Sequence, residues 1–97
     1  MYVGAMEVDL HIPDCRSLKA KRAVVKPLVE GLRRRFSVSV SEVAFQDKWQ
    51  RARIGVAVVS SSPTHAADVL DEAERFVWSF PEVQVLDTTR HWLEGTG

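Results

Sequence analysis

Hydrophobic and polar residues alternate along four short segments of the chain, and a period of two residues is typical of strands with one buried face. The clearest segment has its hydrophobic positions at Met6, Val8, Leu10 and Ile12. The other three segments cover residues 36–45, 51–60 and 83–92. We therefore expect a four-stranded sheet whose inward face forms the core.

Two longer segments have the helical spacing of hydrophobic residues instead. The first helix is expected to begin after an N-cap at Ser17 and to reach about Arg35, with Pro27 on its outer side. The second is expected to begin after an N-cap at Ser62 followed by a proline. The order βαββαβ predicts a ferredoxin-like α+β fold, a two-layer sandwich of one four-stranded antiparallel sheet with two helices on one face, in a single domain of residues 1–97.

Right-handed crossovers fix the order of the strands in this fold. The third strand should lie between the first and second, and the first between the third and fourth. The start of the first helix and the hairpin loop at residues 46–50 then share one end of the sheet. The arginines at residues 33–35 should lie at the other end.

The second strand breaks its own alternation. Its inward positions are expected to shift to Val43 and Phe45 after a bulge near Ser41 or Glu42, because an extra residue changes which side chains face the core. In the last strand, Leu86 and Thr88 are expected on the open face of the sheet, away from the helices.

Charge is balanced over the whole chain but unevenly distributed. The 13 basic and 13 acidic residues give a net charge of zero. Residues 16–35 carry eight basic residues and one acid, whereas residues 66–94 carry seven acids and two arginines. We expect a strong electrical dipole, with a basic surface suited to an anionic partner.

Cysteine and histidine usage excludes several classes of site. Cys15 is the only cysteine, so internal disulfides and multi-cysteine metal sites are excluded, and a reducing compartment is expected. His11, His65 and His91 lack the spacing of metal ligands, and we expect no metal and no cofactor. The apolar runs are too short to cross a bilayer, so we expect a cytoplasmic protein with no membrane partner.

The start of the first helix, "CRSLKAKR" at residues 15–22, carries four cations where a helix dipole favours anions. One interpretation is an anion site, because free N–H groups, the dipole and basic side chains together bind phosphate. The alternatives are a solvated basic face and pairing with an acidic partner. Lys21 favours the anion site, because its helical angle lies inside the apolar stripe and its side chain must reach along the end of the sheet.

The hairpin loop adds an aromatic residue between cations. Trp49 lies between Lys48 and Arg51, an arrangement that can stack an unpaired base and hold its phosphates. The alternative is that Trp49 caps the hairpin or is buried in a dimer contact. The complete predicted anion or nucleic-acid site consists of Arg16, Ser17, Lys19, Lys21, Arg22, Lys48, Trp49 and Arg51.

Three segments resemble the YlxP-like family of small bacterial proteins, and the likeness covers nearly the whole chain. They are "SLKAKR", "FSVSVSEV" and "QDKWQRARIGVAVVS". Ala20 departs from the family pattern, which usually has an acid at this position. The resemblance implies a ferredoxin-like fold in a bacterial cytoplasmic protein. Because family members are often encoded beside translation-initiation and ribosome-maturation factors, it also implies an RNA or ribosome context, and it brings no enzymatic activity.

The open face of the sheet lacks the aromatic signature of an RNA-recognition motif. Ala57, Val59 and Leu86 on that face suit packing between sheets, and they predict a homodimer interface. Glu7, Asp9 and His11 lie there too, but an exposed polar face explains them more simply than acid–base catalysis does.

No glycine-rich phosphate loop, nucleophile elbow or metal cluster indicates an enzyme. The sequence therefore predicts a non-enzymatic RNA-binding, ribosome-associated protein that uses the basic end of the sheet. The alternative is a protein–protein adaptor that uses the same end against an acidic partner.

Overall fold

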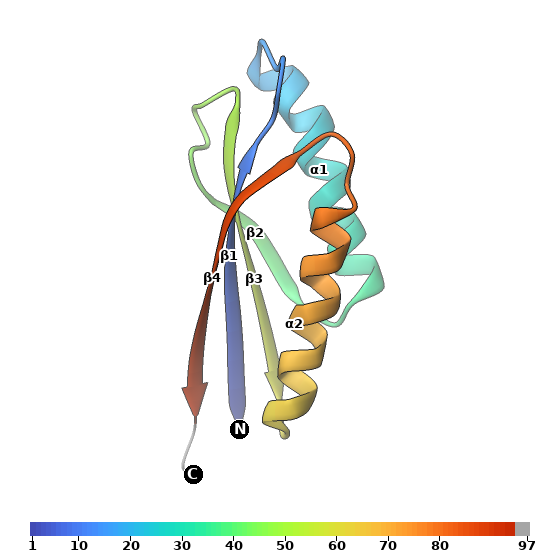
Figure 1. Cartoon of the computed structure of the whole chain (residues 1–97), viewed down its shortest axis with the longest axis vertical. Helices are drawn as coiled ribbons and strands as arrows, with labels where there is room; N and C mark the ends of the chain where they lie inside the picture. Colours follow the sequence, from blue (N-terminus) through green and yellow to red (C-terminus); the bar gives the residue numbers. More distant parts are fainter. Residues whose placement is uncertain (95–97) are drawn as a thin grey trace.

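The computed structural model describes residues 1–94, and it confirms the predicted order of elements. The elements are β1 (Tyr2–His11), α1 (Leu18–Arg35), β2 (Ser39–Ala44), β3 (Arg51–Ser60), α2 (Pro63–Trp78) and β4 (Gln84–Glu94). The strands form one antiparallel sheet in the order β2-β3-β1-β4, and both helices lie on one side of it (Figure 1). This is the predicted ferredoxin-like fold. The last three residues of the predicted domain lie outside the described residues.

Both helices begin at the predicted N-caps. Ser17 Oγ accepts a hydrogen bond from the Ala20 N–H at 3.0 Å, and Ser62 Oγ accepts one from the His65 N–H at 3.2 Å. These bonds satisfy donors that a helix leaves free in its first turn. Pro27 lies on the exposed side of α1, and the helix continues past it.

The core lies between the helices and the inward face of β1 and β3. Met6, Val8 and Leu10 alternate on β1 as predicted, and none of them has exposed surface. Leu28 and Leu32 of α1 are equally buried. Burial of such apolar side chains is the main favourable contribution to folding. Within residues 1–94, neither helix has the length and hydropathy needed to cross a membrane.

The bulge in β2 is confirmed, but the predicted inward residues after it are wrong. The register against β3 shifts between Glu42 and Ala44. Glu42 lies opposite the buried Ile54 and takes the inward position, because it forms an ion pair beneath α1 that is described below. Val43 lies instead on the open face, where it covers Gly55 and is 46% exposed.

Phe45 also lies on the open face, contrary to the prediction. Its ring lies 5.1 Å from the guanidinium of Arg53, whose strand position faces away from the helices. Phe45 has a φ of 64°, in the left-handed region that is uncommon for residues other than glycine, and it ends β2. Its carbonyl accepts a hydrogen bond from the Lys48 N–H at 2.9 Å, which closes the turn into the hairpin loop.

A second bulge, in β4, changes which residues face the open side. Asp87 pairs with Asp9 and Val85 pairs with Leu10, so Leu86 has no direct partner on β1. Thr88 lies opposite the buried Val8, on the helix side of the sheet. The prediction that Thr88 lies on the open face together with Leu86 is therefore wrong.

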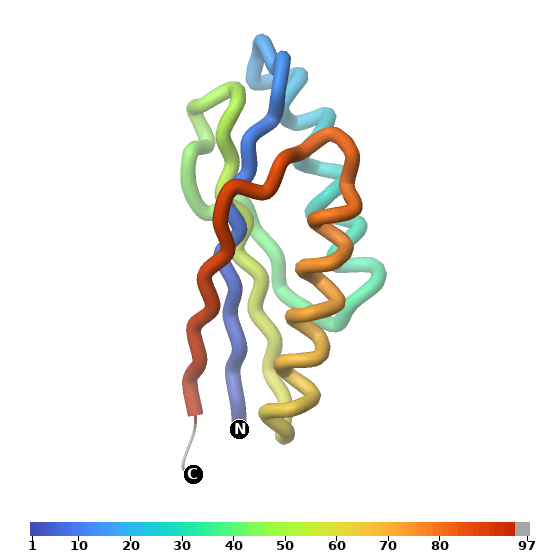
Figure 2. The backbone as a smooth tube through the Cα atoms, in the orientation of Figure 1, coloured from blue at the N-terminus to red at the C-terminus, as the bar shows by residue number. Residues whose placement is uncertain are grey.

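The ends of the elements lie as the topology predicts. The start of α1 and the loop between β2 and β3 share one end of the sheet, and β1 begins and β4 ends at the other (Figures 1 and 2). Gln50 joins the two loops, because its carbonyl accepts a hydrogen bond from the Ile12 N–H at 2.9 Å and its side-chain amide donates to the Cys15 carbonyl at 3.2 Å.

Candidate nucleic-acid interface

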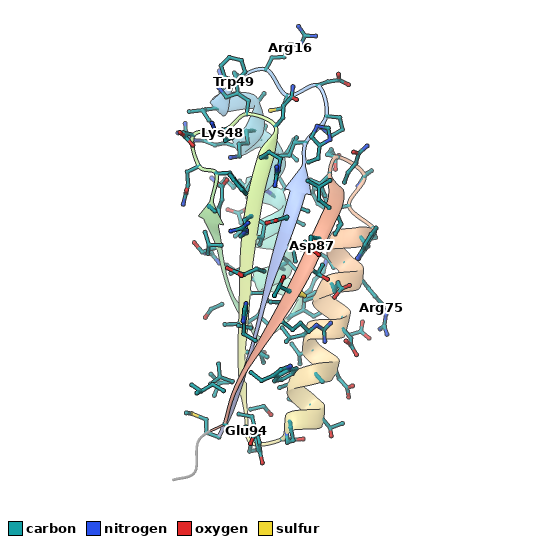
Figure 3. The ribbon with its side chains drawn as sticks, turned by 60° about the vertical axis from the view of Figure 1, so that its left-hand side comes forward. Arg16, Lys48, Trp49, Arg75, Asp87 and Glu94 are labelled. Atoms are coloured by element: carbon teal, nitrogen blue, oxygen red, sulfur yellow. The ribbon has the colours of Figure 1, made fainter. Side chains whose placement is uncertain are left out.

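Most of the predicted site residues lie at the end of the sheet where α1 begins. We call this surface the basic end, and it consists of Arg16, Ser17, Lys19, Arg22, Lys48 and Trp49. Arg16, Lys48 and Trp49 project at the same end of the molecule, although they come from different loops (Figure 3). The fold thus brings together two sequence segments about 30 residues apart.

The cations of the basic end are available to a partner. Arg16, Lys19, Arg22 and Lys48 are all exposed. Among residues 1–94, none of these side chains has a carboxylate oxygen within 4.0 Å, and the first turn of α1 contains no acid. Their charges are therefore not neutralised inside the described part of the chain.

Backbone donors add to this positive potential. The first intrahelical hydrogen bond of α1 runs from the Lys21 N–H to the Ser17 carbonyl at 3.0 Å, and the Ser17 side chain takes the Ala20 N–H. Helix geometry provides no acceptor within α1 for the N–H groups of Leu18 and Lys19. Together with the positive end of the helix dipole, these groups favour an anion at this place.

Trp49 is 52% exposed, so the hairpin does not bury it. The loop that carries it is fixed on both sides, by the Phe45 carbonyl at its start and by Gln50 at its end. An exposed indole on a fixed loop, with a cation adjacent in the sequence, can stack on an unpaired base.

Lys21 does not belong to the basic end, which corrects one residue of the predicted site. Its helical angle buries it as predicted, and only 2% of its surface is exposed. Its ammonium, however, lies 2.7 Å from Glu42 Oε2 and donates a hydrogen bond to the Phe45 carbonyl at 2.5 Å. These two partners are the physical reason that Lys21 is not free to hold an external anion.

Arg51 does not belong to the basic end either, which corrects a second residue of the predicted site. Its guanidinium lies 4.7 Å from the centre of the Phe45 ring and 4.0 Å from Asp9 Oδ2, on the open face of the sheet. Arg53 donates from Nε to Asp9 Oδ1 at 2.5 Å, and this hydrogen bond holds the pKa of the Asp9 carboxyl below its usual value of 3.8. Arg51 therefore belongs to a group of charged side chains on the open face, together with Asp9 and Arg53.

The three residues predicted for the dimer interface do not form one patch. Ala57 is half-buried, and Val59 is 66% exposed opposite Val3 near one end of β1. Leu86 lies at the β4 bulge beside Asp9, six residues along β1, or about 20 Å away in an extended strand. The face between them carries the charged side chains of Glu7, Asp9 and Arg53 and the imidazole of His91. Face-to-face packing would bury these charges, so the sheet-face dimer stays a prediction with weaker support.

Sequence reasoning missed a groove between α1 and β2. The groove has a volume of about 290 Å³, and its lining includes Leu18, Val25, Val29, Arg22, Lys26 and Arg33. The only signal in the sequence was the spacing of the three cations, which places them on one side of the helix. Within residues 1–94, no cluster of three or more His, Cys, Asp or Glu side chains could hold a metal ion.

The chain is similar to proteins of one family and to a ferredoxin fold. A family described as "Protein of unknown function (DUF503)" matches residues 3–90. A relative named "Uncharacterized protein YlxP", from Bacillus subtilis (strain 168), is 40% identical over 91 residues, which cover 94% of this chain and 99% of that protein. A de novo designed protein with a ferredoxin fold has a TM-score of 0.52 at 13% identity, over 100% of this chain and 89% of the designed one.

Proposed function

The chain belongs to the family described as "Protein of unknown function (DUF503)", and from that premise we propose that it is a non-enzymatic, cytoplasmic protein that binds single-stranded RNA in a ribosomal context. The observation that carries the proposal is the exposed Trp49 beside cations at the start of α1 that have no carboxylate partner among residues 1–94. The basic end thereby combines the two features that single-stranded nucleic acid needs, a positive track for the backbone and an aromatic surface for a base.

In this proposal a phosphate lies at the start of α1. The free N–H groups of the first turn point toward it, and Lys19 and Arg22 neutralise it. A neighbouring base stacks on Trp49, while Lys48 contacts the next phosphate. Each phosphate that the protein neutralises should add about −0.7 to the slope of log affinity against log salt. Two to three such contacts give a clearly salt-dependent complex.

The test compares two arginines of α1. Arg22 at the basic end and Arg34 at the opposite end are both exposed, and neither is in an ion pair within residues 1–94. Arg22→Glu should weaken binding of a short single-stranded RNA by about tenfold or more, because it removes one phosphate contact and adds a repulsion. Arg34→Glu, with the same change of net charge, should have less than about a twofold effect.

Fluorescence anisotropy with a labelled oligonucleotide of about eight nucleotides, within the range of such sites, measures both variants. Equal loss in the two variants would mean that RNA responds only to net charge, and the basic end would not be the site. Loss confined to Arg22→Glu would support it. Trp49→Ala provides an independent measurement, because it removes the stacking surface without changing charge.

The groove between α1 and β2 favours a second candidate function, an adaptor for an acidic protein segment. Its lining combines apolar side chains with the cations Arg22, Lys26 and Arg33, which outnumber Glu30, the one acid of the lining that is not paired with Lys21. Such a groove suits a segment with both apolar and acidic residues. Lys26→Glu should affect this binding and leave RNA affinity nearly unchanged, and competition by a short RNA would separate the two functions.

A further inference from the structure

The two edges of the sheet differ in how they are protected. Strand β2 has six residues and a bulge, and two side chains cover its edge. Arg33 Nη2 donates to the Val40 carbonyl at 2.6 Å, and Gln46 Nε2 donates to the Glu42 carbonyl at 3.4 Å. Short, bulged and covered edge strands do not readily pair with another chain. The β2 edge is therefore closed.

The β4 edge has little of this protection. β4 is 11 residues long, contains no proline, and pairs with β1 alone within the described sheet. Beyond its bulge the register with β1 continues without a break from Asp87 to Glu94. Three large apolar side chains of the strand are exposed, Leu86 (53%), Trp92 (48%) and Leu93 (62%). A long, regular edge with apolar side chains is a template for pairing with another strand.

In β4, residues that lie equally far before and after Thr89 are suited to pair with each other. We infer that two copies of this chain pair antiparallel through β4, with a two-fold axis at Thr89. The pairs across the axis are Asp87 with His91, Thr88 with Arg90 and Thr89 with Thr89, all within the unbroken register that follows the bulge. Each pair keeps its two members on one face of the joined sheet, because their numbers have the same parity.

The polar side chains on the open face support this register. His91 Nε2 lies 3.3 Å from Glu7 Oε2 of its own chain, and Asp87 of the second copy would approach the imidazole from the other side. Asp87 is exposed, and it has no cation within 4.0 Å among residues 1–94. The dimer provides this carboxylate with a partner, and the pair forms twice because the interface is isologous.

The helix side is also compatible. Arg90 is already paired with Asp71 at 2.8 Å and with Glu74 at 3.1 Å, both on α2, so Thr88 of the second copy meets a neutralised arginine. Moving the axis by one residue to Arg90 would place two arginines directly opposite each other, which is unfavourable. The axis at Thr89 avoids that repulsion and retains the Asp87 pairing.

A single cysteine on the axis tests the inference. In a Cys15→Ala background, Thr89→Cys should form a disulfide-linked dimer under mild oxidation, because directly opposite residues of antiparallel strands lie about 4.5–5.5 Å apart at Cα, within disulfide range. Two exposed or half-buried positions in the same background serve as controls, Ser39→Cys on the β2 edge and Ala57→Cys on the open face. We expect about tenfold more crosslinking at residue 89 than at either control, since pairing raises the local thiol concentration.

Light scattering of the unmodified protein provides a second readout. The wild type should have the mass of a dimer, and Thr89→Lys, which places two like charges on the axis, should have the mass of a monomer with the same circular dichroism spectrum. Thr89→Val should remain dimeric. A wild type that stays monomeric at about 1 mM would overturn the inference. Crosslinking at Ala57→Cys in preference to Thr89→Cys would also overturn it, and would place the interface on the sheet face.

Discussion

The buried pair of Lys21 and Glu42 allows a prediction that separates a structural lysine from a functional one. Lys21→Met removes the ammonium and keeps most of the side-chain volume, so the core should not form a large cavity. The change leaves Glu42 without its cation and the Phe45 carbonyl without its side-chain donor. The matched variant Glu42→Leu leaves the ammonium instead, and Lys19→Met at an exposed position of the same turn is the control for charge.

The geometry gives the expected magnitudes. Two unit charges 2.7 Å apart attract by about 6 kcal/mol at an effective dielectric constant of 20. Desolvation costs several kcal/mol per ion, so most of this attraction is offset. Breaking a fully buried pair costs about 3–5 kcal/mol. Glu42 Oε2 is buried, but the Glu42 side chain as a whole is 23% exposed and can turn toward water, whereas the Lys21 side chain is 3% exposed and cannot.

We therefore expect Lys21→Met to lower the free energy of unfolding by about 2–3 kcal/mol and Glu42→Leu to lower it by about 3–5 kcal/mol. The double variant should be within about 1 kcal/mol of the wild type, because two apolar side chains replace the pair together. Urea unfolding followed by circular dichroism measures all four proteins. With a slope of about 1 kcal/mol/M, the midpoint of each single variant should lie more than 1 M below that of the wild type, and the midpoint of the double variant should lie within about 1 M of it.

RNA binding is the second readout of the same variants. Under conditions in which Lys21→Met is fully folded, it should bind single-stranded RNA like the wild type, whereas Lys19→Met should bind more weakly. The buried pair would be refuted if each single variant lost less than about 0.5 kcal/mol of unfolding free energy and the double variant lost the sum of the two. A loss of RNA affinity in fully folded Lys21→Met would mean that Lys21 belongs to the anion site after all.

Three further predictions follow from other contacts. Arg53 lowers the pKa of Asp9 in the folded state, so this carboxylate stabilises the protein above pH 3.8, and the contribution is lost as the pH falls through the lowered pKa. In urea unfolding, Asp9→Asn should therefore be less stable than the wild type at pH 7, and the difference should disappear at low pH. Ser62→Ala should cost about 1 kcal/mol in the same assay, because the His65 N–H loses its cap. Trp49→Ala should cost about 1–3 kcal/mol of RNA binding free energy by anisotropy and change the unfolding midpoint little.

The elements and their order could be predicted from the sequence because they depend on local periodicity and caps. Ser17 and Ser62 cap the helices as expected, and β3 begins and ends where its alternation does. The bulges could not be placed as well. In β2 the inward position is decided by an ion pair between Glu42 and Lys21, 21 residues apart, and no pattern within the strand records that partner.

The candidate site was predictable to a similar extent. The topology correctly placed Trp49 at the start of α1, because the crossover rule determines which loops share an end of the sheet. It could not determine which cations would be free. Lys21 and Arg51 have the same charge as Lys19 and Arg22, but their partners lie on β2, β1 and the hairpin loop, and only the packing of those elements shows that they are engaged.

The two hydrogen bonds of Gln50 have a consequence for the kinetics of binding. Since they tie the hairpin loop to the segment that precedes α1, Trp49 and the helix start keep a fixed spacing in the free protein. A preorganised surface loses little conformational entropy when it binds, so differences in affinity between ligands should appear mainly in their dissociation rates. Gln50→Ala, which removes the side-chain bond to the Cys15 carbonyl, should then slow association without removing any group that touches the ligand.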